Sequence, residues 1–372
     1  MKKFLPKFAA IFLLFLSSAF AEERGQYPNL SGTTLFQFNA DRVLSTQKTG
    51  VAPNNVFVYV ESDFGLNFNQ NWSVRTNWRI QPNSVLTTRD PVNPERYRTF
   101  LSSDRGIHVD DSGLLIEELK IQFQNEDMIF VAGKFDPKFG TAHNKAKRIG
   151  VFTAQVTEDY NLREKIGVSL SALLENSKVT VNSFFNDTTG LSGSAVNDRK
   201  TASSKNGTAG ATNALASYSV SIDGKDLFEV EDLTYNLGFR SLSVTRLEGR
   251  QREKGYVAGL EYLYRMGNTS IIPFAEIVKI TSLTGEQGRD ADYKTLALIS
   301  KYSSWTGSVA YLERTVKSHE ASEGIKKSDQ VQLSVGYKFT NNLTLDFSRS
   351  NMKEDGYRAS VIGVVASYLY KF

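Results

Sequence analysis

Histidine, serine, cysteine and carboxylate side chains are the residues that most often carry enzymatic chemistry, and their pattern in this sequence is sparse. The chain contains three histidines, His108, His143 and His319, and no cysteine. A hydrolase would need one of these histidines beside a serine or an acid, but no Gly-x-Ser-x-Gly segment accompanies them. No His, Asp and Glu spacing is typical of a metal site. The sequence therefore disfavours an enzyme, and no cofactor is expected.

Charged residues outside these positions suggest a different kind of site. The segment 140–163 carries three basic residues, Lys145, Lys147 and Arg148, followed by the acids Glu158 and Asp159. Opposite charges facing each other across a narrow aqueous channel would create a transverse field and select ions. Such charges could equally be solvated on a surface loop, so the predicted role depends on whether this segment lies inside the molecule.

Strict two-residue alternation indicates how the remaining charges are placed. In 330–339, Val331, Leu333, Val335, Tyr337 and Phe339 alternate with polar residues, which is typical of a strand with one apolar face. The same rule places Arg75 and Arg79 opposite Trp72, Val74, Trp78 and Ile80. In the expected strand 128–139 it places Lys134, Asp136 and Lys138 opposite Ile129, Val131 and Phe135. Lys120, Lys165, Arg240 and Lys338 are assigned to the same polar face.

The connections between the expected strands alternate between short and long. Short turns such as 69–71, 125–127 and 340–342 alternate with long polar segments such as 84–112, 140–163, 186–213 and 352–357. A soluble sandwich has no reason to sort its loops in this way, whereas a transmembrane β-barrel has short periplasmic turns and long extracellular loops. We predict an all-β chain, a single antiparallel transmembrane barrel of about sixteen strands spanning 22–372.

The N-terminus has the features of an export signal. Lys2, Lys3 and Lys7 precede an apolar stretch, and Ala19-Phe20-Ala21 forms an A-x-A cleavage site. We therefore predict a signal peptide at 1–21. Its removal takes away three basic residues and no acids, so the charge of the remaining chain is nearly balanced. Nucleic acid, which requires a strong basic excess, is not an expected partner.

Two segments resemble Gram-negative outer-membrane porins of the sixteen-stranded superfamily. The final strand ends in Tyr-Leu-Tyr-Lys-Phe, so Tyr368, Tyr370 and Phe372 match the terminal signal that the barrel-assembly machinery reads in that family. The segment 132–140 resembles a Gly-Lys-Phe-x-Pro-x-Phe-Gly strand found in several porin families. The third-loop motif Pro-Glu-Phe-Gly-Gly of the enteric members is absent.

The resemblance implies a water-filled channel in the outer membrane for passive diffusion of small hydrophilic solutes and ions. It also implies contact with outer-membrane lipid, a homotrimer, and a third long loop, 140–163, that constricts the pore. With Lys145, Lys147, Arg148, Glu158 and Asp159 at this constriction and Arg75, Arg79, Lys134 and Lys138 on the wall, we expect a mild anion preference. The alternatives are an uptake porin selective for phosphate, sugar or siderophore, an adhesin that uses loop 186–213, and a barrel enzyme.

Overall fold

The computed structural model describes residues 27–82, 105–108, 112–149, 152, 154–195, 208–245, 247–318, 324–339 and 342–372. Side chains are described in all of these except 146–149 and 154–155. The expected signal peptide, 1–21, lies outside the described residues, as do His319 and part of loop 186–213.

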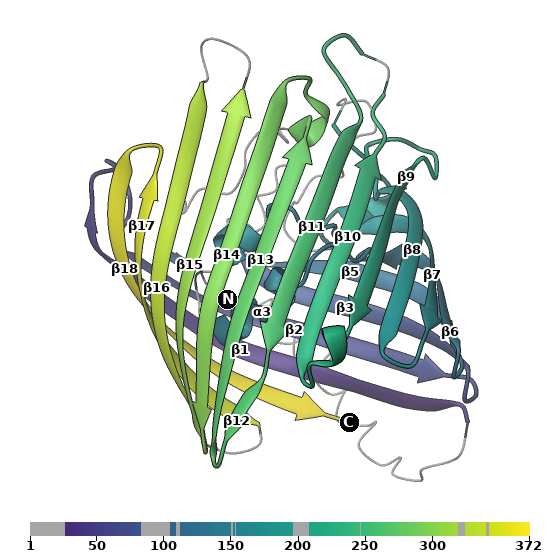
Figure 1. Cartoon of the computed structure of the whole chain (residues 1–372), viewed down its shortest axis with the longest axis horizontal. Helices are drawn as coiled ribbons and strands as arrows, with labels where there is room; N and C mark the ends of the chain where they lie inside the picture. Colours follow the sequence, from purple (N-terminus) through teal and green to yellow (C-terminus); the bar gives the residue numbers. More distant parts are fainter. Residues whose placement is uncertain are drawn as a thin grey trace, which may run out of the picture.

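The described chain forms one closed antiparallel barrel (Figure 1). The strands are β1 (Asn29–Thr46), β2 (Asn54–Asn67), β3 (Trp72–Pro82), β4 (Ile107–His108), β5 (Ser112–Gln124), β6 (Met128–Phe135), β7 (Lys165–Leu173), β8 (Ser177–Asn186), β9 (Ser217–Gly224), β10 (Leu233–Leu242), β11 (Glu253–Tyr262), β12 (Tyr264–Met266), β13 (Thr269–Thr281), β14 (Arg289–Tyr302), β15 (Trp305–Ser318), β16 (Ile325–Lys338), β17 (Leu343–Glu354) and β18 (Tyr357–Lys371). Helices α3 (Ala142–Ile149) and α4 (Ala154–Thr157) follow β6, and three short 3-10 turns, η1 (Gly190–Ser192), η2 (Leu227–Glu229) and η3 (Leu283–Gly285), lie between later strands.

Sixteen of these segments make up the wall, as the sequence predicts. β12 continues the pairing of β11 along β13, and β4 is a two-residue segment that runs parallel to β2. The ring closes between the first and last strands, where Thr33 to Thr46 pair with Lys371 to Ala359. These two strands, purple and yellow, lie side by side in Figure 1. Closure leaves no unpaired sheet edge, which a barrel in lipid requires.

The two faces of the wall differ as the alternation predicts. Large apolar side chains such as Phe38, Leu296, Leu298 and Leu333 are about half exposed on the outside. Inward-facing positions of the wall carry Ser, Thr, Asn, Gln and charged residues, for example Asn182 on β8, Ser219 on β9 and Gln330 on β16. Among the described residues, no helix combines the length and the apolar character needed to cross a membrane.

The loops follow the expected alternation with one correction. The connection 352–357, predicted to be long, is a tight turn in which Glu354 pairs with Tyr357. Asp355 and Gly356 have φ values of 48° and 88°, the left-handed pair that a two-residue hairpin turn prefers. Below, the end that carries turns 68–71, 125–127 and 303–304 is called the short-turn end, and the opposite end is called the long-loop end.

Candidate functional site: a segment inside the barrel and its charged wall

β6 ends earlier than the sequence predicts, and this releases the chain into the barrel. The expected strand 128–139 ends at Phe135, and 136–140 follow without regular structure. Lys138 reaches the inward carboxylate of Asp223 on β9, with 2.6 Å between Nζ and Oδ1. Phe139 is buried beneath the guanidinium of Arg240, which lies 4.6 Å from its ring centre. The residues from 136 to 164 are called the inner segment below; of these, 150, 151 and 153 lie outside the described residues.

Glu276 on β13 holds the start of α3. Its Oε2 accepts hydrogen bonds from the backbone N–H groups of Thr141 and Ala142, at 2.6 and 3.1 Å, and from the Thr141 hydroxyl at 3.0 Å. Its Oε1 accepts a hydrogen bond from the hydroxyl of Tyr160 at 2.8 Å. A carboxylate at a helix N-terminus satisfies free N–H groups and opposes the positive end of the helix dipole. One wall residue therefore holds both limbs of the inner segment: the limb that enters the barrel, at the start of α3, and the limb that returns to the wall, at Tyr160.

The inner segment packs against an apolar stretch of the inward face. Ile272, Phe274, Ile299 and Leu312 of β13 to β15 point inward and are nearly fully buried. Lys145 of α3 forms an ion pair with Glu261 and lies 4.8 Å above the Phe274 ring. Without a covering segment, these side chains would face water, so burial of this apolar surface favours the inward position of the segment.

The returning limb, which follows α4, is also held by ion pairs and by an apolar contact with the wall. Asp159 forms an ion pair with Arg314 of β15 at 2.7 Å, and Glu354 holds the other side of the same guanidinium at 2.8 Å. The ring of Tyr160 packs on Tyr293 with 5.0 Å between centroids. Burial and the neighbouring Glu276 carboxylate raise the pKa of Tyr160 well above its ordinary value, so the phenol stays a hydrogen-bond donor at neutral pH.

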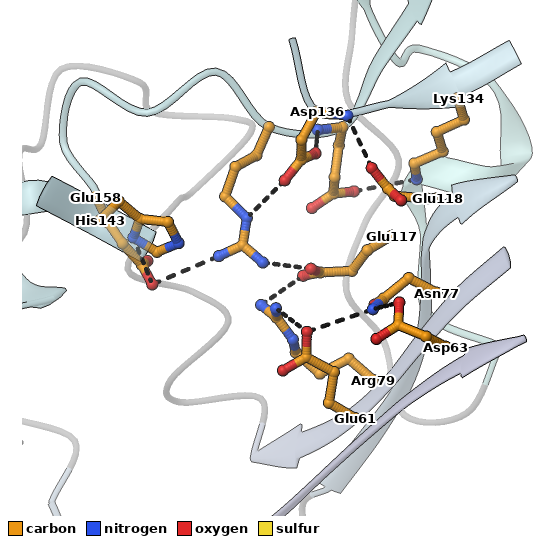
Figure 2. A network of polar contacts seen from close by, with 12 residues as sticks. Glu61, Asp63, Asn77, Arg79, Glu117, Glu118, Lys134, Asp136, His143 and Glu158 are labelled. Carbon is orange, nitrogen blue, oxygen red and sulfur yellow. Dashed lines mark hydrogen bonds and ion pairs between the residues drawn. The ribbon is translucent and has the colours of Figure 1, made fainter. Parts of the chain in front are cut away.

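The limb ends in a chain of alternating charges on the wall of β2, β3 and β5 (Figure 2). Arg163 forms ion pairs with Glu117, with Asp136 at 3.5 Å and with Glu158 at 3.5 Å. Glu117 also binds Arg79 at 2.7 Å, and Arg79 lies 3.6 Å from Glu61. Asn77 donates to Asp63 at 2.7 Å and to Glu61 at 3.3 Å. His143 of α3 lies 3.9 Å from Glu158 and so extends this chain of polar side chains.

Burial and the neighbouring charges shift the pKa values of Asp136 and Arg163, the two ends of the inner segment in this network. Burial raises the pKa of Asp136, and Arg163 only partly offsets the shift. Burial alone would lower the pKa of Arg163, but the carboxylates of Glu117, Glu158 and Asp136 raise it well above its ordinary value. Arg163 therefore remains charged, and its removal would leave buried carboxylates without their counter-ion.

A β-bulge explains why two consecutive acids reach the interior. The β3–β5 register shifts between Asn77 and Trp78, so that Asn77 pairs with Glu118 while Trp78 pairs with Ile116. Glu117 is the extra residue of the bulged strand. Both acids turn inward. Glu117 binds Arg79 and Arg163, and Glu118 binds Lys120. Strict alternation cannot detect this, because a bulge resets the parity of the strand.

The prediction that Ile129 and Val131 of β6 face lipid is wrong. The prediction that Lys134 belongs to the charged wall is preserved in part. Ile129 and Val131 pair with the buried Ser171 and Ser169, so they share the inward rows, while Phe130 pairs with the outward Leu170. Gly133 has a φ of 128°, and the regular alternation breaks there. Lys134 is 2% exposed and is held by Glu164 at 3.1 Å, Asp187 at 2.8 Å and the Leu191 carbonyl. It is thus a buried wall cation and does not face open water.

The remaining residues of the predicted site divide into three groups. Lys138, Lys145, Glu158, Asp159 and Arg79 belong to the ion pairs described above. Lys147 and Arg148 lie in α3, but their side chains are outside the described atoms. Among the described residues Arg75 has no carboxylate partner, and with Asn67, Gln122 and Gln124 it lines a cavity of about 380 Å³ at the short-turn end.

The terminal aromatic residues lie on the outside of the barrel at the short-turn end. The Phe372 ring lies 5.4 Å from Phe64 and 5.8 Å from Tyr370, and Tyr368 is 43% exposed. A Cβ added to Gly32 would come within 2.6 Å of the Phe372 ring. The ring of Phe372 therefore occupies space that is open because Gly32 has no side chain.

Several residues that hold the site together were not among those predicted. These residues are Glu276, Arg163, Glu117 and Arg314, which make the hydrogen bonds and ion pairs between the inner segment and the wall described above. A sequence signal exists for Glu276 and Arg314, because each is a charged residue in the inward register of an otherwise alternating strand. Among the described residues, no three His, Cys, Asp or Glu side chains are grouped in a way that could hold a metal ion.

Comparison with known proteins places this architecture among outer-membrane barrels. No family model and no curated protein matches the sequence. The fold is similar to that of OmpF of Salmonella typhi in complex with daunomycin, at 10% identity and a TM-score of 0.59, covering 92% of this chain and 97% of that one. It is also similar to the outer-membrane channel DcaP of Acinetobacter baumannii, at 9% identity and a TM-score of 0.58, with the same coverage.

A third similar structure is the trimer form of the Vibrio cholerae outer-membrane protein OmpT, at 8% identity and a TM-score of 0.53, covering 92% of this chain and 99% of that one. At these identities the likeness is one of fold. The chain has a sixteen-stranded porin-type fold. This barrel, with its apolar outer face, fits an outer-membrane location.

Proposed function

We propose that the protein is a porin that forms a water-filled channel for passive diffusion of small hydrophilic solutes and ions across the outer membrane. The main support is the position of the inner segment, which contacts the inward face of β13 to β15 and would narrow the barrel there. Barrels of 16 to 18 strands are wide enough for an aqueous channel. In this proposal the predicted loop 140–163 is the constriction.

The ion pairs modify the expected selectivity. Lys134, Lys138, Lys145 and Arg79 are each neutralised by a nearby carboxylate, so the basic residues do not form a ladder for phosphate. The proposed mild anion preference therefore rests on Arg75, together with Lys147 and Arg148. Lys147 and Arg148 belong to the inner segment, whereas Arg75 lies on the wall nearer the short-turn end; channel selectivity depends on the fixed charges along the path that are not cancelled.

Exchanging these charges would test the selectivity proposal. Arg75→Glu and the combined change of Lys145, Lys147 and Arg148 to Glu should each move the reversal potential in a salt gradient toward cations. Arg265→Glu, at the exposed rim where Arg265 meets Asp232, is the matched control and should have little effect. If none of these changes moves the reversal potential, the selectivity lies elsewhere and the assigned pore residues are wrong.

The assembly state and partners are also proposals. The trimer form of the Vibrio structure supports a homotrimer. The terminal Tyr368, Tyr370 and Phe372 support recognition by the barrel-assembly machinery. Chemical cross-linking of the folded protein in outer membranes would test the trimer: bands up to three chains are expected, and a single-chain band alone would contradict it.

Solute-selective uptake and catalysis are the competing functions. Selective uptake would require a saturable current or transport rate for one solute, whereas a diffusion channel should give a flux proportional to concentration. A barrel enzyme would use a histidine beside an acid, and the pair of His143 and Glu158 is the described candidate. His143→Gln should leave solute flux intact if the protein is a channel, and the expectation that it is no enzyme remains a prediction.

A further inference from the structure

The outer face of the barrel carries a group of lysines beyond its apolar belt. Leu296, Leu298, Val309 and Leu333 form part of this belt on β14 to β16. Further toward the long-loop end, the same strands and their neighbours carry outward-facing lysines. These residues, called the lysine collar below, are Lys254, Lys279, Lys294, Lys317, Lys327 and Lys353.

Strand register places four of the six collar lysines in two adjacent rows that face outward. Lys279 pairs with Tyr256 on one side and Asp292 on the other, and Asp292 is followed across the sheet by Thr315 and Lys327. In the adjacent outward row, Ile277, Lys294, Glu313, Asp329 and Lys353 follow one another. Ile277 is 58% exposed, and paired residues of antiparallel strands share a face, so both rows lie on the outside.

Neighbouring aromatic residues mark the level of the collar as a membrane interface. Tyr218, Phe239 and Tyr256 are in contact on the outer surface, with 5.9 and 5.2 Å between successive ring centroids. Aromatic girdles of membrane barrels lie where the apolar band ends and headgroups begin. Because Tyr256 pairs directly with Lys279, the collar begins at this boundary.

The six lysines of this surface outnumber the four carboxylates that face outward among them, Asp290, Asp292, Glu313 and Asp329. Lys294 and Lys327 both bind Glu313, at 3.0 and 2.8 Å, and Lys317 binds Asp292 at 3.0 Å. These lysine side chains are still 50 to 57% exposed, whereas Glu313 is 12% exposed and Asp292 is 35% exposed. Within the described chain, Lys254, Lys279 and Lys353 form no ion pair with a carboxylate, and all three are exposed.

We propose that the lysine collar binds the phosphate groups of anionic lipid headgroups in the membrane leaflet at the long-loop end. The collar lysines are spread in rows across neighbouring strands of the outer face, so their arrangement suits a layer of headgroups better than a single small ion. Lysine stems can cover apolar surface while the ammonium groups reach the headgroup level. Six lysines against four carboxylates leave this surface positively charged, and the lysines that bind Glu313 and Asp292 remain exposed enough to contact a phosphate.

Native mass spectrometry of the folded barrel in detergent would test this inference. The probes are cardiolipin, whose headgroup has two phosphates, and phosphatidylcholine, whose headgroup has no net charge. We expect preferential retention of cardiolipin. The variant K254Q/K279Q/K353Q should bind it on the order of 100-fold more weakly, since one interfacial lysine contributes about 1 kcal/mol. The variant K254R/K279R/K353R should retain binding because it keeps the charge.

The matched control is K301Q/K326Q/K338Q, which removes three lysines from inward-facing positions of β14 and β16. It should bind cardiolipin like the unchanged protein. Retained gel mobility of the unheated protein would show that each variant is folded. Equal loss in the control and collar variants, undiminished binding by the glutamine collar variant, or loss in the arginine variant would each overturn the proposal. Displacement of cardiolipin by millimolar inorganic phosphate would also overturn it, because the surface would then be a site for the free ion.

Discussion

At the scale of single residues, Arg163 has the most consequential position in the site. Its side chain is 5% exposed, and its guanidinium connects the end of the inner segment to Glu117 on the wall and to Asp136 and Glu158 within the segment. An ion pair broken in a buried environment leaves an uncompensated charge, which costs about 3–5 kcal/mol. Arg163 therefore stabilises the position of the inner segment mainly by preventing this penalty.

Arg163→Ala should destabilise the folded barrel by several kcal/mol and increase fluctuations of the open-channel current. Thermal unfolding, followed by loss of the fast-migrating band on a gel, measures the first effect, and bilayer recording measures the second. Arg265→Ala is the matched control. The pair of Arg265 and Asp232 is 59% and 30% exposed, and such surface pairs contribute about 0–1 kcal/mol. Equal effects of the two substitutions would show that the Arg163 network does not hold the segment.

Asp136 predicts a pH dependence of selectivity. Burial raises the pKa of Asp136, so this carboxyl takes up a proton at a higher pH than an exposed aspartate does. Each proton removes one negative charge beside the channel, and the reversal potential should therefore move toward anions as the pH is lowered from neutral. Asp136→Asn should already have part of this shift at neutral pH and change less on acidification. An unchanged pH profile in that variant would contradict the assignment.

At the scale of elements, the inner segment depends on one anchor in β13. Glu276 accepts hydrogen bonds from Thr141, Ala142 and Tyr160, which belong to both limbs. Hydrogen bonds to a charged group contribute about 1.5–3 kcal/mol each. Loss of this anchor should release the segment while leaving the barrel strands paired.

Glu276→Ala should thus raise the single-channel conductance and make it noisier, with little change in folded yield. Glu313→Ala offers the matched control, because Glu313 lies on the outward face of β15 and contacts lysines there. Bilayer recordings of both variants measure the size of the single-channel conductance and its noise. A normal, quiet conductance in Glu276→Ala would mean that other contacts are sufficient to hold the segment.

The terminal strand predicts an assembly effect. Phe372 packs on Phe64 and above Gly32 at the closure between β1 and β18. Phe372→Ala should lower the amount of folded barrel in the outer membrane, as measured by heat-modifiable mobility on a gel. Phe339→Ala, which changes a 55% exposed aromatic residue at the same end, tests whether any loss is specific. Equal folded yields for Phe372→Ala and the unchanged protein would contradict the prediction.

Sequence patterns predicted the wall far better than the site. Alternation and loop length define the strands because each side chain faces either lipid or lumen, and these environments select different residue types. The bulge at Glu117 and the irregular backbone at Gly133 reset that alternation, so Glu117 was missed and Lys134 was misplaced. Alternation marks Glu276 and Arg314 as inward charges, but their partners lie over 100 positions away, and no local pattern identifies these partners.

At the scale of the whole molecule, the interior is asymmetric. The inner segment covers the apolar inward face of β13 to β15, while the wall of β2, β3 and β5 carries the alternating charges that meet Arg163. The lysine collar lies on the outside of β11 and β13 to β17, which include the strands that the inner segment covers from within. One side of the barrel is thus reinforced, and the aqueous path is proposed to run between the segment and the charged wall.

The central claim, that this barrel is an open aqueous channel narrowed by the inner segment, is tested most directly by planar-bilayer recording of the purified folded protein. We predict discrete, ohmic conductance steps in simple salt, in groups of three if the protein is a trimer, with a larger unit step in Glu276→Ala. Protein that is folded by gel mobility, inserts into the bilayer and gives no steps in either form would contradict the claim.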